Sequence, residues 1–132
     1  MRTTRLKMTD EDQTQFNAAL RLRNKGERRE ALRMLLPLQV NNPNFAPLHG
    51  MIATTFFELA QYELAASAFR RATELSKKSR LASLGLFHSL WQLDKQAEGI
   101  TELKRFTATG EWQDYAEIAI NLGIRVPEKS RR

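Results

Sequence analysis

The feature that most constrains this chain is a residue pattern that repeats every 34 residues. A shift by one such period superposes small residues on small ones, large apolar residues on large ones, and turn residues on turn residues. The superposed sets are Ala31, Ala65 and Gly99; Leu35, Phe69 and Leu103; and Gly26, Ala60 and Asp94. A fixed period of this length is typical of a repeat array, in which each unit packs mainly on its neighbours.

Apolar residues recur at intervals of three and four, which predicts helices and no convincing strand. Turn residues interrupt this pattern at Gly26, 41–47, 76–80, Asp94–Lys95, Thr109–Gly110 and Gly123. The sequence therefore predicts an all-α fold of about seven helices with short connections. Pro37 should kink or shorten the helix that contains it.

Large and small side chains alternate along one predicted helix, residues 62–75. Tyr62, Ala65, Phe69 and Ala72 share a face of this helix. Alanines at this spacing favour close approach by another helix, with aromatic side chains filling the space beside it.

This pattern resembles the tetratricopeptide repeat (TPR) family, with repeats at 12–45, 46–79 and 80–113. The second repeat matches six family positions, namely Ile52, Ala53, Phe56, Ala65, Phe69 and Ala72. The third departs from the pattern, with Phe87 and Phe106 where the family has small residues, and it can also be read two residues earlier. The resemblance implies an α-solenoid of antiparallel helix pairs.

The ends of the chain are expected to differ from its body. Residues 9–123 should form a single domain, closed by an amphipathic capping helix at 111–123. Basic tails are expected at 1–8 and 124–132, with no secretory leader in the first of them.

The resemblance further implies that the first helix of each repeat lines a concave groove. The groove residues carried over are Phe16, Asn17, Leu20, Arg23 and Asn24; Gly50, Met51, Thr54, Phe57 and Glu58; and Leu84, Gly85, His88, Trp91 and Gln92. This lining is mostly apolar and aromatic, which suits an apolar helix or an extended peptide. Gly50 and Gly85 are explained either by a closely approaching ligand or by packing. Phe57 and Trp91 are either groove floor or core.

Basic pairs recur on the opposite, convex side. Arg70–Arg71 and Lys104–Arg105 are separated by one repeat period and would form a basic ridge. The ridge is either a solvated helix face or a site for an acidic partner or nucleic acid.

No catalytic constellation is present in the sequence. His49 and His88 lack carboxylates at metal-ligand spacing, and the chain has no cysteine and no glycine-rich phosphate loop. We therefore expect no enzymatic activity, cofactor or metal. The net charge of +6 favours acidic partners, but much of it lies in the tails. No stretch is long and apolar enough to span a membrane, and a cytoplasmic location is expected.

The sequence thus predicts a protein–protein interaction module of adaptor or chaperone type that binds a partner segment in its groove. Two alternatives stay open. One is a binder of nucleic acid or acidic surfaces through the ridge, although nucleic acid is the less expected partner. The other is a bacterial secretion chaperone or a toxin-neutralising immunity protein, and a homodimer is also left open.

Overall fold

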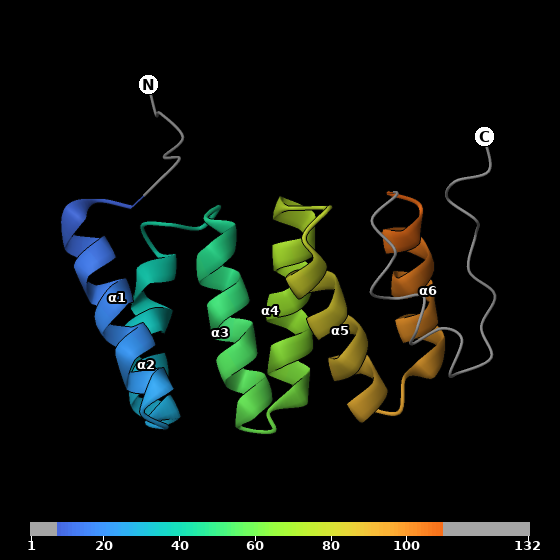
Figure 1. The fold of residues 1–132 in the computed structure, drawn as a ribbon, viewed down its shortest axis with the longest axis horizontal. Helices are drawn as coiled ribbons and strands as arrows, with labels where there is room; N and C mark the ends of the chain where they lie inside the picture. The colour runs from blue at the N-terminus through green and yellow to red at the C-terminus, as the bar shows by residue number, and fades with distance from the viewer. Residues whose placement is uncertain (1–7, 110–132) are drawn as a thin grey trace.

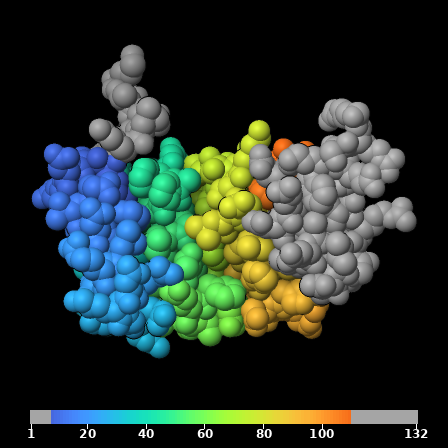
Figure 2. All heavy atoms as spheres, in the orientation of Figure 1, coloured from blue at the N-terminus to red at the C-terminus, as the bar shows by residue number. Residues whose placement is uncertain are grey.

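The structure is a computed structural model that describes residues 8–109. Its six α-helices and one 3-10 helix follow one another along the long axis of the molecule (Figure 1). They are α1 (Asp10–Asn24), α2 (Arg28–Leu35), η1 (Leu36–Gln39), α3 (Ala46–Glu58), α4 (Tyr62–Leu75), α5 (Arg80–Gln92) and α6 (Gln96–Thr107). Every packed helix pair is formed by near neighbours in the chain, so the body is an elongated stack (Figure 2). The described residues form an all-α, TPR-like solenoid of antiparallel helix pairs.

The repeat period is carried by the helix boundaries themselves. Both ends of α5 lie one period after the corresponding ends of α3, and α6 begins one period after α4. This spacing fixes the third helix pair in the register of the first two rather than in the reading two residues earlier.

The turn inside each helix pair has the same conformation. Gly26, Ala60 and Asp94 all have positive φ, at 89°, 61° and 62°. After each of them, the next N–H donates to the carbonyl five residues back: Glu27 to Leu22, Gln61 to Phe56 and Lys95 to Leu90. This Schellman-type closure ends the first helix of each pair and starts the second. The turn equivalence predicted from spacing is therefore confirmed.

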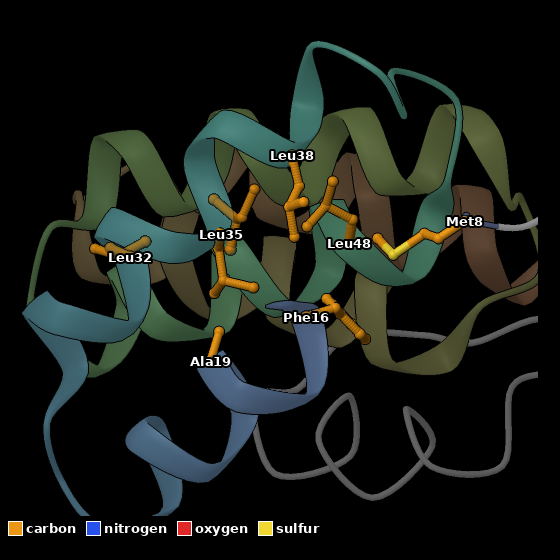
Figure 3. Packing of buried hydrophobic residues seen from close by; sticks show 8 residues of the cluster. Met8, Phe16, Ala19, Leu32, Leu35, Leu38 and Leu48 are labelled. Atoms are coloured by element: carbon orange, nitrogen blue, oxygen red, sulfur yellow. The ribbon is translucent and has the colours of Figure 1, made fainter. Parts of the chain in front are cut away.

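The first helix pair packs around a core that extends into α3 (Figure 3). Met8, Phe16, Leu35 and Leu48 are among its buried members. Met8, the first described residue, is 5% exposed and belongs to this core, although the sequence placed it in the N-terminal tail. Burial of a long apolar side chain against α1 and α3 explains this position.

Pro37 changes the second helix of the first pair. Helix α2 ends at Leu35, and the chain continues as the 3-10 helix η1 with Pro37 near its start. A proline ring excludes the i−4 hydrogen bond and opposes a continuing α-helix. As a result, α2 has 8 residues where α4 has 14.

The alternating face of α4 is buried as expected. Ala65, Phe69 and Ala72 are 0%, 3% and 2% exposed, and α4 packs on both α3 and α5. The third pair uses a different distribution of size, because Phe87 is buried and a side chain at Gly99 would lie 3.4 Å from its ring. The predicted capping helix and the C-terminal tail lie outside the described residues.

Candidate functional site

An apolar pocket of about 180 Å³ opens between α3 and α5. It lies on the face carried by the first helices α1, α3 and α5, which we call the groove face. Its lining consists of Thr54, Phe57, Phe69, Leu81, Leu84, Gly85 and His88. Five of these seven residues are among those predicted for the groove, and they come from two different helix pairs.

Gly85 gives the pocket its floor. A Cβ atom at this position would lie 2.3 Å from the ring of Phe69, which reaches across from α4. Phe69 is buried, so its ring has little room to move aside. Packing therefore explains this glycine, and the ring that packs on it also forms part of the pocket lining.

The side wall of the pocket is aromatic. Phe57 is half-buried at the end of α3, and its ring makes an edge-to-face contact with Tyr62 at a centroid distance of 5.2 Å. This contact fixes the ring orientation and leaves part of Phe57 facing the pocket.

Trp91, the register equivalent of Phe57, has a different environment. It stacks on Phe87 at 5.1 Å and lies against Gly99 of α6. It is half-buried in the third core cluster and is not part of the pocket lining. Because Gly99 has no side chain, the indole of Trp91 packs directly on α6. The repeat register alone does not predict this contact, so it places Trp91 beside Phe57 in the groove lining.

The groove residues predicted from the first pair are dispersed. Phe16 is 8% exposed and packs edge-to-face on Phe45, so its side chain belongs to the core and is not available to a partner. Leu20 is half-buried against the same core. Asn17 is exposed and accepts a hydrogen bond from Gln13. Asn24 is exposed at the end of α1.

Arg23 and Glu58 form an ion pair that joins the first two helix pairs. Arg23 donates two hydrogen bonds to the carboxylate, at 2.9 and 2.6 Å, and Arg28 of α2 donates a third at 3.1 Å. Partial burial acts to raise the pKa of Glu58, but the two guanidinium groups outweigh it and hold the pKa below its usual value.

The predicted residues from the middle of α3 differ in accessibility. Gly50 is buried, yet a Cβ atom there would meet nothing within 4 Å. Met51 is half-buried against the first core cluster. The Thr54 hydroxyl donates a hydrogen bond to the Gly50 carbonyl at 2.8 Å, and the residue also lines the pocket.

His88 lines the pocket and is exposed to solvent. Partial desolvation lowers its pKa, since burial disfavours the charged imidazolium. The neutral form is therefore favoured beside the apolar lining. Gln92, one turn further along α5, is exposed.

The arginines of the predicted ridge are engaged within the molecule. Arg71 donates to the side chain of Asn44 at 2.8 Å and to the Pro43 carbonyl at 3.4 Å. Its equivalent, Arg105, donates to the Lys77 carbonyl at 3.0 Å. Each guanidinium thus fastens the loop that precedes its own pair.

Further contacts give the ridge a structural role. Arg105 also binds the buried carboxylate of Glu102 at 2.6 Å, and Ser83 donates to that carboxylate at 2.6 Å. Arg70 lies 3.6 Å from Glu98. Lys104 makes no ion pair with any described residue, so it is the ridge member with the freest charge.

Sequence reasoning missed two residues of the pocket, Phe69 and Leu81. The sequence predicts only a helix-packing role for Phe69. Because Gly85 has no side chain, the ring of Phe69 also lines the pocket. Leu81 is 61% exposed at the start of α5. A large exposed aliphatic residue beside apolar positions is the signal that would have found it.

Within residues 8–109, no group of three metal-ligating side chains comes together. None of the helices in that part of the chain has the length and apolar character needed to cross a membrane.

No protein-family model matches the sequence, and no curated protein matches it. Solved structures do match. One is MamA (residues 41 to the end) from Desulfovibrio magneticus RS-1, with a TM-score of 0.71 and 20% identity over 79% of this chain and 59% of that chain. Another is the type III secretion translocator chaperone SycD from Yersinia enterocolitica, with a TM-score of 0.73 and 14% identity over 88% of this chain and 89% of that one.

The fold is TPR-like. At these identities the likeness establishes the fold alone, and this chain spans about three fifths of the MamA chain. The cytoplasmic location expected from the sequence stays a prediction.

Proposed function

We propose that this chain is a protein-interaction module that binds an apolar segment of a partner protein on its groove face. The observation that carries the proposal is the pocket between α3 and α5. A volume of about 180 Å³ is enough for one Leu- or Phe-sized side chain, because apolar cavities near 150 Å³ accept a benzene ring. An apolar pocket with a few polar groups at its edge is the usual form of a ligand site.

The partner segment should place one large apolar side chain in the pocket and lie across Thr54, Leu81 and His88. Phe57 offers the largest contact surface, and buried aromatic residues commonly dominate binding energy. No residue of the pocket suggests chemistry on the bound segment, so the proposed role is binding without catalysis and without a cofactor.

A more specific candidate is a bacterial secretion chaperone. It is supported by the SycD structure, which matches nearly the whole length of both chains. An adaptor role shares the same groove mechanism and differs in the partner. The ridge alternative has weaker support, because Arg71 and Arg105 are engaged by loop carbonyls.

The test begins with peptides selected from a random phage-displayed library on the immobilised protein. Their affinities are then measured for the natural protein, for Phe57→Ala and for a ridge control carrying Arg70→Glu and Lys104→Glu. We expect Phe57→Ala to weaken binding at least about tenfold, which corresponds to about 1.4 kcal/mol. The ridge control should bind as the natural protein does, with little dependence on salt.

The opposite pattern would contradict the proposal. Binding that survives Phe57→Ala, disappears in the ridge control and falls steeply with salt would place the site on the ridge and favour a polyanionic partner. Circular dichroism and thermal unfolding of each variant separate loss of binding from loss of fold.

A further inference from the structure

Positive charge in the described part of the chain is concentrated around the turn between α1 and α2. Residues 21–33 contain six basic and two acidic side chains, a net charge of +4. The other described residues, 8–20 and 34–109, contain eight basic and nine acidic side chains, a net charge of −1. This turn lies at the same end of the stack as the C-terminal end of α3 (Figure 1).

The ion pairs beside this turn leave Arg28 with unused hydrogen-bond donors. The carboxylate of Glu58 accepts two hydrogen bonds from Arg23 and one from Nε of Arg28, so two guanidinium groups share one negative charge. Neither terminal amino group of Arg28 has an acceptor among the described residues, and its side chain is 39% exposed. Arg28 can therefore bind a second carboxylate and keep its bond to Glu58.

Arg28 lines a hollow of about 360 Å³, which we call the turn pocket. Its charged lining residues are Glu27, Arg28, Arg29, Glu30 and Glu58. Of these glutamates, Glu30 is paired with Arg33, and Glu58 is paired with both Arg23 and Arg28. With these partners included, four arginines surround three glutamates. A carboxylate that enters the turn pocket thus meets an excess of positive charge.

The turn pocket and the pocket between α3 and α5 meet at the C-terminal end of α3. Phe57 lines the pocket between α3 and α5, and the next residue, Glu58, lines the turn pocket. An α-helix with its side chains is about 10–12 Å across, and an extended peptide advances about 3.3 Å per residue. A bound segment with an apolar side chain beside Phe57 therefore reaches Arg28 within about two to four residues.

The repeat itself does not require this charge. At the junction between the second and third helix pairs, the positions equivalent to Arg23, Arg28 and Glu58 carry no charged residue. The helices there pack in the same register. The positive charge is therefore a property of one end of the groove face, next to the pocket, and not of the solenoid.

We propose that Arg28 is a specificity-determining residue, which binds an acidic side chain about two to four residues from the apolar anchor of the partner segment. The terminal amino groups of Arg28 donate to this carboxylate, while Nε keeps its bond to Glu58. The apolar anchor provides most of the affinity, and the charge pair selects acidic segments over neutral or basic ones. This inference rests on the proposed function, because it names the chemistry of the segment that the groove face binds.

The test starts from the phage-displayed peptide library. Selection on the natural protein should enrich Asp or Glu two to four positions from a large apolar residue, and selection on Arg28→Gln should not. The matched control is Arg33→Gln, which removes the same charge from the same helix at a residue outside the turn pocket. It should keep the acidic preference.

A double-mutant cycle then measures the contact itself. A selected peptide is compared with its Glu→Gln version on the natural protein and on Arg28→Gln. We expect the peptide substitution to weaken binding to the natural protein about three- to tenfold and to have no effect on Arg28→Gln. The arm on the natural protein does not depend on the folding of any variant, and circular dichroism with thermal unfolding checks the variants.

The outcomes separate this inference from the proposed function. Peptides that need Phe57 but show no acidic preference would overturn the role of Arg28 and leave the pocket assignment in place. So would a peptide carboxylate that contributes equally on the natural protein and on Arg28→Gln, or an acidic preference that Arg33→Gln abolishes as well. Peptides that bind equally well to Phe57→Ala would contradict the pocket assignment and, with it, this proposal.

Discussion

The two junctions between helix pairs use the same register but different chemistry. At the first junction Arg23, Arg28 and Glu58 form a bridge of ion pairs. The equivalent positions at the second junction hold Phe57, Tyr62 and Gln92, and the two aromatic rings contact each other. One set of backbone positions thus supports a polar bridge in one place and an aromatic wall in the other.

The same contrast appears deeper in the packing. Leu35 and Met51 belong to the first core cluster, and the equivalent residues at the second junction are Phe69 and Gly85. At the first junction the larger side chain of the α3 position, Met51, accompanies Leu35 of α2. At the second junction the large side chain is Phe69 of α4, and the α5 position holds Gly85. The pocket arises from this exchange of volume, because the ring of Phe69 covers Gly85 without filling the space beside it. Conserving the backbone period while redistributing side-chain volume is how a repeat array can acquire a site at one junction.

The largest expected effect comes from introducing at the second junction the residues found at the equivalent positions of the first. Gly85→Met alone should lower the free energy of unfolding by at least about 2 kcal/mol, since the new side chain overlaps the ring of Phe69. Adding Phe69→Leu should recover part of that loss, with a coupling of about 1–3 kcal/mol in a double-mutant cycle. Urea denaturation measures all four proteins. Strictly additive effects would show that the two residues do not share this space.

Substitutions in the turns should give the next largest effect. The expected change in the free energy of unfolding has opposite signs in the first and second helix pairs. Ala60 has positive φ and carries a strain of about 1 kcal/mol, so Ala60→Gly should raise the free energy of unfolding by about that amount. Gly26→Ala should lower it similarly. Thermal or urea unfolding checks both changes, and an Ala60→Gly variant that is less stable than the natural protein would be inconsistent with the shared turn geometry.

Gly50 on α3 and Gly85 on α5 differ in the space available for a side chain, and alanine substitutions at the two positions test this difference. Gly50→Ala adds a methyl group that meets nothing within 4 Å, and alanine is favoured over glycine in a helix by up to about 1 kcal/mol. We expect this variant to be more stable, whereas Gly85→Ala should be less stable. Equal shifts in the two unfolding midpoints would remove the distinction between the two glycines.

The smallest effect is pH-dependent and confined to the first junction. The pKa of Glu58 is lower in the folded state than in the unfolded chain. Its stabilising contribution is therefore present above the unfolded pKa and is lost as pH falls through the folded pKa. For a partly exposed ion pair the contribution is below about 1 kcal/mol.

Glu58→Gln, which introduces the residue found at the equivalent position 92, should reduce this acid-induced loss. Urea titrations of both proteins at pH 7 and pH 3 make the comparison. An unchanged difference between the two pH values would mean that other carboxyl groups account for the acid sensitivity.

Much of the fold could be predicted from the sequence because the period is local. The positive-φ turns at Gly26, Ala60 and Asp94 and the buried face of α4 follow from spacing and residue size. The shortening of α2 follows from Pro37.

The site was harder to predict because it depends on contacts between elements. The repeat register places Phe16 and Trp91 at groove positions. In the structure Phe16 packs on Phe45, and Trp91 packs against Gly99. The loop contacts of Arg71 and Arg105 depend on where backbone carbonyls lie, which no residue pattern encodes.

The central claim is that the pocket at the second junction accepts an apolar side chain. Titration of the ¹⁵N-labelled protein with indole, followed by NMR, tests it without a known partner. We predict saturable shifts at the amides of Thr54, Gly85 and His88 in the natural protein, and their loss in the folded variant that carries both Phe69→Leu and Gly85→Met. Saturable shifts at these amides that persist in the double variant, or no saturable shift there in the natural protein, would contradict the account.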